Sequence, residues 1–335
     1  MLEEALASAD VVAAQLKSTT NIEALAARLA EEPRHVALTV ARGSSDHAAS
    51  YFAGLTMSRI GVPVASLPMS VATLQQAPLR VKGQLAVAFS QSGKSPDLVG
   101  TMQALRQAGA FTVAAVNAPN SPLADACEWH LPLLAGAELS VAATKSYIAM
   151  LSLSAIVIAH VQKDIELLKA LETLPDALRA AGKLNWLHAI DELKNVDRMF
   201  VIGRGLGLAI AQEAALKFKE TSGIQAEAFS SAEVRHGPME IIESGYPLLI
   251  FALRGPEQEG LLKLASDMKA RGARVLLAAP ADVAEANLPL ALTDHPALDP
   301  IAAILSFYVM AAGLAAARGR NPDAPRHLNK ITETH

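Results

Sequence analysis

Short apolar segments alternate with amphipathic segments along most of the chain. In the first half, the apolar segments are residues 35–40, 84–89 and 111–117, and a long helical pattern follows from Ala142 to His160. Strands that are separated by helices of ten or more residues are typical of a parallel sheet with helices on both faces. The pattern therefore predicts the α/β fold class.

The second half of the chain repeats this pattern at residues 198–203, 247–253 and 273–279. Three pairs of glycines at predicted turns have nearly the same spacing, 162, 162 and 163 positions: Gly43 and Gly205, Gly93 and Gly255, and Gly109 and Gly272. Glycine is common at the turns of any fold of this class, because it adopts backbone conformations that a Cβ atom disfavours. A nearly constant spacing nevertheless favours a tandem duplication.

We therefore expect two similar α/β subdomains, one at residues 30–165 and one at 190–318. A helical connector at 166–189 joins them, an N-terminal helix occupies 1–29, and a polar C-terminal tail covers 319–335.

The composition narrows the class of protein. The 335 residues carry a formal net charge of −4, which gives no electrostatic footprint for nucleic acid. The single cysteine, Cys127, excludes a disulfide framework and fits a reducing cytoplasm.

Two apolar stretches, 146–161 and 301–317, are shorter than the roughly 20 residues that span a bilayer, so we expect buried core helices. With no secretory signal pattern in the first residues, we expect a cytoplasmic protein with no membrane or nucleic-acid partner.

The sequence contains no pattern for a metal or a redox cofactor. Its nine histidines are scattered, and no HxxxH or CxxC pair exists. The glycines at 203, 205 and 207 lack the spacing of a nicotinamide fingerprint. We therefore expect no metal and no cofactor.

A hydroxyl-rich loop, Ser90 to Asp97 (SQSGKSPD), follows a predicted strand and precedes a helix. Hydroxyls, loop amides and the positive end of a helix dipole together suit a phosphate group, and open α/β sheets bind ligands where strands end. The alternative is a turn in which Ser95 or Asp97 only caps the helix. The loop at 42–47 lies in the same place after the first strand, whereas the matching loops of the second half lack hydroxyls. Only the first subdomain is therefore expected to bind phosphate.

A second candidate site lies around Lys217 and Glu220. These two residues, and likewise Glu213 and Lys217, are spaced to share one face of a helix. Such pairs usually lie on a solvated surface. The His236-Gly-Pro turn nearby could hold a rigid imidazole and adds support to the alternative, a catalytic role. Lys330 lies in an otherwise uncharged part of the tail, where a lysine is ordinarily just exposed.

Six segments taken together resemble the SIS (sugar isomerase) family. They are GSSDHA at 43–48, FSQSGKSPD at 89–97, VAATKSY at 141–147, EAALKFKE at 213–220, AEAFSSAEVRHGP at 226–238 and PRHLNKIT at 325–332. They occur in the order of the family and extend over nearly the whole chain. The resemblance implies two tandem flavodoxin-like SIS subdomains that bind a phosphosugar, each a parallel sheet with helices on both faces.

The resemblance also implies roles for individual residues. The phosphate and substrate would contact Ser45, Ser90, Gln91, Ser92, Ser95, Val141, Ala143 and Thr144. Glu220 would be the base that moves a proton between C1 and C2, with Lys217 beside it. His236 would assist ring opening from the neighbouring subunit, which implies a homodimer. Lys330 would contact the sugar hydroxyls or the developing oxyanion.

Within the family, the chain resembles the isomerase half of glucosamine-6-phosphate synthases and, more closely, the glucosamine-6-phosphate deaminases of SIS type. Its first strand is predicted near residue 35, so we expect no glutaminase domain and favour deamination. Arg42 and Ala143 replace a cysteine and a serine of the synthases, which affects sugar recognition and leaves the phosphate site intact. The alternatives are another isomerase, deaminase or deglycase, acting on galactosamine or fructosamine 6-phosphate, and a phosphosugar sensor without catalytic activity.

Overall fold

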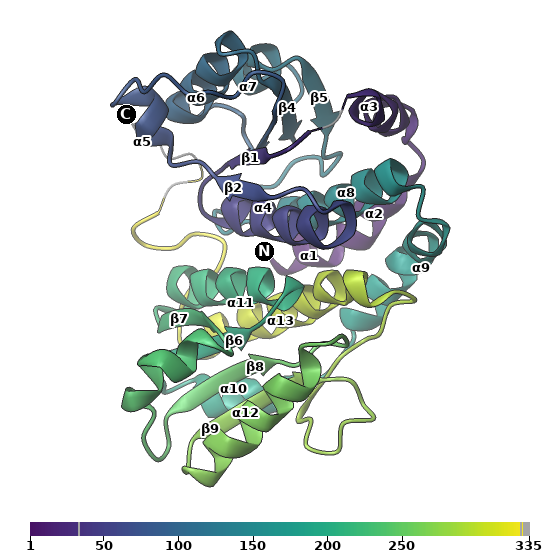
Figure 1. Ribbon diagram of the computed structural model, residues 1–335. Helices are drawn as coiled ribbons and strands as arrows, with labels where there is room; N and C mark the ends of the chain where they lie inside the picture. Colours follow the sequence, from purple (N-terminus) through teal and green to yellow (C-terminus); the bar gives the residue numbers. More distant parts are fainter. Residues whose placement is uncertain (33, 329, 331–335) are drawn as a thin grey trace. The chain divides into compact units, whose positions relative to one another are not determined.

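A computed structural model describes residues 1–32, 34–328 and 330. The chain divides into two compact units (Figure 1). The N-terminal unit contains residues 10–138, 145–172 and Lys330, and the C-terminal unit contains 1–9, 139–144 and 173–328.

A five-stranded parallel sheet forms the centre of the N-terminal unit, in the order β2-β1-β3-β4-β5. Its strands are β1 (Ala37–Val40), β2 (Val64–Ser66), β3 (Leu85–Ser90), β4 (Phe111–Val116) and β5 (Trp129–Pro132). Every residue of β1, β3 and β4 is buried. Because these strands are covered on both faces, they read as continuous apolar segments in the sequence.

Helices cover both faces of this sheet (Figure 1). One face carries α5 (Met69–Thr73), α6 (Pro96–Gln107) and α7 (Pro122–Ala126). The other carries α3 (Thr20–Glu31), α4 (Ser44–Leu55) with the π-turn η1 (Thr56–Ile60), and α8 (Lys145–Gln162). Two further helices cross the division between the units: α2 (Ser8–Leu16) ends in the N-terminal unit, and α9 (Ile165–Ala181) begins in it. The expected single N-terminal helix is therefore wrong, since α1 (Leu2–Leu6), α2 and α3 are three separate helices.

The C-terminal unit repeats this architecture, with the strand order β7-β6-β8-β9-β10. Its strands are β6 (Arg198–Gly203), β7 (Gln225–Ser230), β8 (Pro247–Phe251), β9 (Arg274–Ala279) and β10 (Leu288–Pro289). Its helices and turns are α10 (Leu187–Leu193), α11 (Leu206–Lys217) with the π-turn η2 (Phe218–Ser222), η3 (Glu233–His236), η4 (Pro238–Ile241), α12 (Gln258–Ala270), η5 (Pro296–Leu298) and α13 (Asp299–Ala317). The predicted fold class, two parallel α/β subdomains, is confirmed.

Backbone details recur at the spacing found in the sequence. The two π-turns begin at Thr56 and Phe218, which are 162 positions apart, and each ends at a left-handed glycine, Gly61 or Gly223. Gly43 and Gly205 have φ angles of 56° and 55° at the starts of α4 and α11. Matching strand order, π-turns and glycine conformations support duplication of one ancestral unit.

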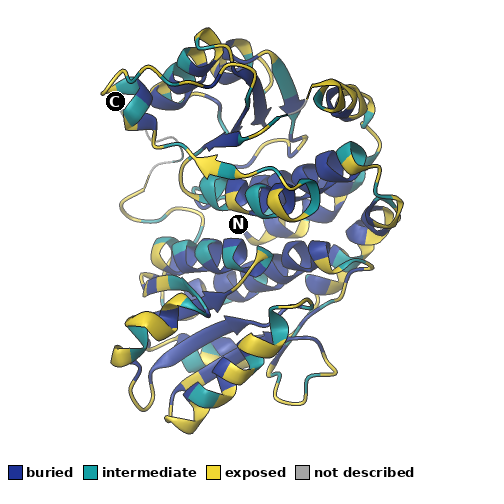
Figure 2. Ribbon diagram, viewed as in Figure 1, coloured by how far each residue is buried: buried dark blue, intermediate teal, exposed yellow. Residues whose placement is uncertain are grey.

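The two long apolar helices, α8 and α13, meet the length and hydropathy that a membrane span requires. In each, 78% of the most apolar window is buried inside the protein, as Figure 2 shows by its colouring. That extent of burial is typical of core helices.

Candidate active site

The hydroxyl-rich loop lies at the point where the strand order of the N-terminal sheet reverses. β1 pairs with β2 on one side and β3 on the other, and all these strands are parallel. The carboxyl ends of β1 and β3 therefore flank a crevice of the kind in which open α/β sheets bind ligands. Ser45 lies in the first turn of α4 after β1, and the Ser90–Ser95 loop follows β3.

Hydrogen bonds within the Ser90–Ser95 loop fix its conformation. The amide of Gly93 donates to Oγ of Ser90 (2.9 Å), and the amide of Lys94 donates to Oγ of Ser92 (3.3 Å). Gly93 has φ = +63°, and a Cβ atom there would clash with the hydroxyl of Ser121, so the close turn requires glycine. Ser95 precedes α6, but its side chain makes no capping hydrogen bond. Ser95 therefore occupies the N-cap position of α6 without using its hydroxyl as a cap.

Arg42 ties the loop after β1 to the start of α6. Its Nε donates to Oδ2 of the buried Asp97 (2.8 Å), and the other carboxylate oxygen of Asp97 accepts from the amide of Leu98 (2.8 Å). Asp97 is thus used to fix the two loops together. Burial, partly offset by the charge of His47, raises the pKa of Asp46 in the first turn of α4.

The equivalent crevice of the C-terminal unit is different. The loop after β6 begins α11 at Gly205, and a Cβ atom on Gly205 would lie 2.5 Å from Oε1 of Glu257. The second copy therefore presents a carboxylate at the start of α11, where the first copy presents hydroxyls. A negative side chain at this position opposes the binding of an anion.

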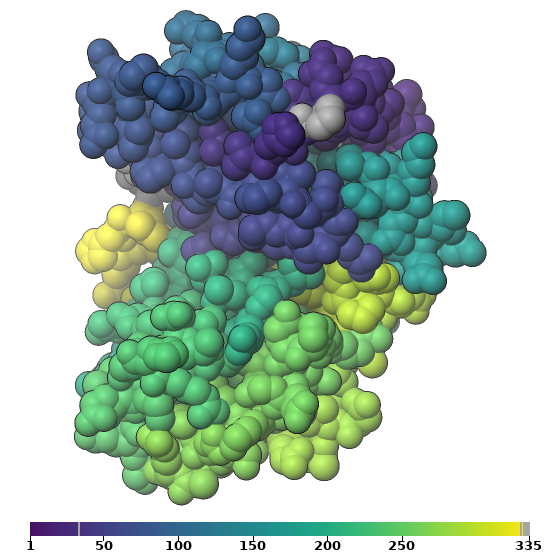
Figure 3. All heavy atoms as spheres, viewed as in Figure 1, coloured from purple at the N-terminus to yellow at the C-terminus, as the bar shows by residue number. Residues whose placement is uncertain are grey.

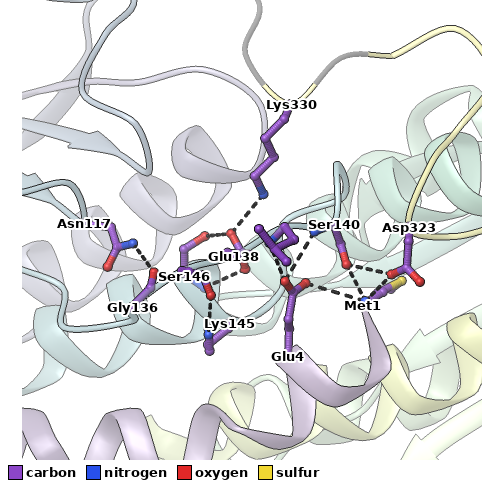
Figure 4. Close-up of polar contacts among 12 residues, drawn as sticks. Met1, Glu4, Asn117, Gly136, Glu138, Ser140, Lys145, Ser146, Asp323 and Lys330 are labelled. Carbon is purple, nitrogen blue, oxygen red and sulfur yellow. Dashed lines mark hydrogen bonds and ion pairs between the residues drawn. The ribbon is translucent and has the colours of Figure 1, made fainter.

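The segment 139–144 belongs to the C-terminal unit and is bonded to the tail (Figure 4). The amide of Val141 donates to the carbonyl oxygen of Asp323 (3.1 Å), and the hydroxyl of Ser140 donates to the Asp323 carboxylate (2.6 Å). Val141 and Ala143 are half-buried, and Thr144 is fully buried.

Lys217 and Glu220 form the centre of a buried ionic cluster. Nζ of Lys217 lies 2.6 Å from Oε2 of Glu220 and 3.3 Å from Oε1 of Glu213. The hydroxyl of Tyr308, on α13, donates to the same Glu213 oxygen (2.9 Å). The side chains of Lys217 and Glu213 are almost fully buried, whereas that of Glu220 is 20% exposed. Of the two carboxylates, only that of Glu220 is open to a ligand.

The charges around Lys217 decide its protonation. Burial alone would lower the pKa of this lysine, but the negative charges of Glu213 and Glu220 and their hydrogen bonds outweigh burial and raise it. A cation is therefore maintained beside Glu220. Helical spacing of this kind ordinarily indicates an ion pair on the surface, but Lys217 makes its ion pairs from a buried side chain.

His236 ends the short turn η3 and is exposed. Arg235 beside it bonds Asp267 on α12 (3.0 Å), and this hydrogen bond lowers the pKa of Asp267. Among the polar contacts described for this unit, none joins His236 to Lys217 or Glu220.

Lys330 is not the freely exposed side chain that its local sequence predicts. Its Nζ lies 3.3 Å from Oε2 of Glu138, and its side chain is only 25% exposed. Glu138 and Tyr308 are the two site residues that sequence analysis missed. An acidic residue inside the apolar segment LLAGAELSVAA was the available signal for Glu138, and Tyr308 offered none.

Within the described part of the chain, no three His, Cys, Asp or Glu side chains lie close enough together to hold a metal ion.

The SIS domain family matches residues 32–159 and 192–280, which together make up more than half of the chain. Two tandem parallel units, with a hydroxyl-rich loop at the sheet crevice of the first, define the class of fold as a doubly wound α/β protein. The chain belongs to the SIS domain family.

Three known proteins illustrate the relationship. A glutamine–fructose-6-phosphate aminotransferase (isomerizing) of Aeropyrum pernix is 35% identical over 318 residues, which are 88% of this chain and 50% of the aminotransferase. The crystal structure of a presumed phosphosugar isomerase from Silicibacter pomeroyi DSS-3 is 38% identical, with a TM-score of 0.91 over 96% of this chain and 99% of that one. Glucosamine-6-phosphate deaminase of Thermotoga maritima shares the fold, at 21% identity and a TM-score of 0.73, over 97% of this chain and 100% of the deaminase. The chain spans about half the length of the curated relatives it matches.

Proposed function

We propose that this protein converts glucosamine 6-phosphate to fructose 6-phosphate and ammonia. The observation that carries the proposal is the Glu220 carboxylate, which is partly exposed and lies 2.6 Å from a buried lysine. Proton transfer between adjacent carbons needs one carboxylate that accepts a proton and returns it. Membership of the SIS family and the hydroxyl-rich loop support a phosphosugar as the substrate.

In this proposal, the phosphate group binds the N-terminal unit. The hydroxyls of Ser45, Ser92 and Ser95 and the Gln91 amide contact its oxygens, while Ser90 both shapes the loop and lines it. The starts of α4 and α6 add the positive ends of two helix dipoles. Because the phosphate is remote from C1 and C2, its binding energy orients the sugar for reaction. Val141, Ala143 and Thr144 contribute the remaining substrate contacts.

The reaction proceeds by proton transfer followed by hydrolysis. His236 of the neighbouring subunit opens the sugar ring, which makes the active protein a homodimer. Glu220 then removes the C2 proton of the open-chain aldose to give an enolamine, and returns the proton to C1. The resulting C2 iminium is attacked by water, and ammonia leaves. Lys330 stabilises the developing oxyanion, and Lys217 balances the charge of Glu220.

The relatives and structural neighbours support a reaction of phosphosugars in general, and they do not single out one substrate. One is an isomerizing aminotransferase, one a presumed phosphosugar isomerase and one a glucosamine-6-phosphate deaminase. Another aldose–ketose isomerase, deaminase or deglycase is the second candidate, favoured by Arg42 and Ala143, the two replacements that affect sugar recognition. The proposed compartment is the cytoplasm, where phosphosugars are metabolised.

A panel of sugar phosphates distinguishes these possibilities. Ammonia and the sugar phosphate formed are measured after incubation with glucosamine, galactosamine and fructosamine 6-phosphates in separate reactions. Turnover that is fastest with glucosamine 6-phosphate supports the proposal. Faster turnover of galactosamine or fructosamine 6-phosphate would reject it in favour of the second candidate. Binding of all three, observed by calorimetry without turnover, would instead identify a sensor.

A further inference from the structure

Glu138 is a fully buried carboxylate in the loop between β5 and α8. Its Oε1 accepts from the amide of Ser146 (3.0 Å), and its Oε2 accepts from the hydroxyl of the same serine (2.7 Å). Ser146 lies in the first turn of α8, whose positive dipole end favours a carboxylate. These bonds fix the orientation of Glu138 without the tail.

The loop that leads to Glu138 is also held in place. Asn117 donates to the carbonyl oxygen of Gly136 (2.7 Å), and the amide of Ala135 donates to Asn117 (2.9 Å). Nζ of Lys145 donates to the carbonyl oxygen of Ala137 (2.8 Å) (Figure 4). A carboxylate positioned this rigidly forms a prepared site for a cation.

Lys330 supplies a cation to this site from the far end of the sequence. Its Nζ lies 3.3 Å from the Oε2 atom that also accepts from Ser146. The described tail residues before it are largely exposed, and Figure 3 shows them on the molecular surface (yellow). A buried carboxylate is stable only with charge partners and hydrogen bonds, so the contact between Glu138 and Lys330 favours the docked tail.

We propose that Glu138 is a positioning residue that docks the tail and holds the Lys330 ammonium in place for the reaction. This inference rests on the proposed function of Lys330. Lys330 is either paired with Glu138 or released from it, and only the paired state, which we call docked, has Lys330 in place for catalysis. Removing the negative charge of Glu138 lowers the docked fraction and therefore lowers kcat.

Trypsin cleavage at the Lys330–Ile331 bond tests docking without any assay of activity. Glu138→Gln retains an oxygen that accepts from Ser146 but loses the ion pair with Lys330. We expect cleavage at this bond, measured by mass spectrometry, to become about tenfold faster. Cleavage after Arg326 serves as an internal reference. Glu128→Gln, the same change at an exposed residue of the same unit, is the matched control and leaves the cleavage rate unchanged.

Kinetics then test the positioning role. In Glu138→Gln, kcat for glucosamine 6-phosphate falls about tenfold while KM changes less, and the melting temperature stays close to that of Glu128→Gln. In Lys330→Arg, which keeps a cation and a trypsin site, the slow cleavage is retained, and it is lost when Glu138→Gln is added. An unchanged cleavage rate in Glu138→Gln would overturn docking, and faster cleavage with an unchanged kcat would overturn the positioning role. Faster cleavage in a protein without aminosugar turnover would support docking and reject the proposed function.

Discussion

The ammonium group of Lys217 lies 2.6 Å from the carboxylate of Glu220, with the lysine buried and the glutamate partly open to solvent. Glu213 contacts the same ammonium from the buried side. One cation therefore joins a carboxylate that is part of the core to a carboxylate that a ligand can reach. This arrangement exposes part of the Glu220 carboxylate, while the buried charges of Glu213 and Lys217 stay paired with each other.

Replacing Lys217 should destabilise the protein strongly. In Lys217→Met the Glu213 carboxylate loses its cation while it stays buried, at an expected cost of about 3–5 kcal/mol in the free energy of unfolding. Urea unfolding measures this loss. Lys219→Met is the control, because Lys219 is exposed two residues further along the chain. Equal effects of the two substitutions would contradict the importance of the buried cluster.

The pH dependence of stability follows from the direction of the Lys217 shift. The pKa of Lys217 is raised above the 10.5 of an unperturbed lysine, so the folded state holds the proton more tightly than the unfolded state. The contribution of this cluster is therefore complete below pH 10.5 and is lost as the pH rises through the folded-state pKa. The difference in unfolding free energy between wild type and Lys217→Met should be constant below that pH and narrow above it. A difference that widens at alkaline pH would contradict the sign of the shift.

The hydroxyls of the Ser90–Ser95 loop should determine affinity for the phosphate. Ser92→Ala and Ser95→Ala each remove one hydrogen bond to a charged group, worth about 1.5–3 kcal/mol, so KM rises roughly tenfold or more. Steady-state kinetics measure the change, and kcat should change less. Ser50→Ala, at an exposed serine of α4, is the control. Equal KM values for all three variants would exclude this loop as the phosphate site.

Gly93 should resist substitution for a backbone reason. Gly93→Ala places a Cβ atom against Ser121 in a left-handed conformation, which should cost about 1–3 kcal/mol and distort the loop. Gly100→Ala, seven residues further in the interior of α6, meets only an ordinary contact with Thr73 and should be neutral or stabilising by up to about 1 kcal/mol. Thermal unfolding of the two variants compares them directly. Similar melting temperatures would show that the turn tolerates a side chain.

Mixed dimers test whether His236 acts on the neighbouring subunit. Glu220→Gln and His236→Ala should each be inactive alone, and mixing them should restore about a quarter of the wild-type activity, because half of the dimers are hybrids with one intact site. Subunit exchange is verified by native mass spectrometry. Exchange without recovered activity would place both residues in the site of one chain.

The sequence predicted those strands that can be recognised from their own residues, without knowledge of the strands beside them. β3 and β8 are buried on both faces, so each appears as an apolar run. The edge strands β2 and β10 were missed because they contain three and two residues, and β7 because polar residues interrupt it. Short strands depend on their neighbours for pairing, and local sequence carries little of that information.

The candidate site follows the same rule. The Ser90–Ser95 loop was predictable as a candidate site because its position directly after a strand can be read from the sequence. Glu138 and Tyr308 were not, since their partners Lys330 and Glu213 are 192 and 95 positions away in the sequence. Helical spacing alone usually indicates a solvated face for Lys217, whereas packing of α11 against α13 buries it. Such contacts depend on tertiary packing and leave no local pattern.

The most direct test follows the proton at C2 of glucosamine 6-phosphate. The substrate is labelled with deuterium at C2 and incubated with wild type and Glu220→Gln, and the label is followed by NMR. We predict that wild type carries part of the deuterium from C2 to C1 of fructose 6-phosphate, because Glu220 returns the proton that it removes. Glu220→Gln should bind the substrate but react more slowly by about 10²–10⁴-fold. Release of ammonia with the label still at C2, or equal rates in the two proteins, would contradict the assignment of Glu220 as the base.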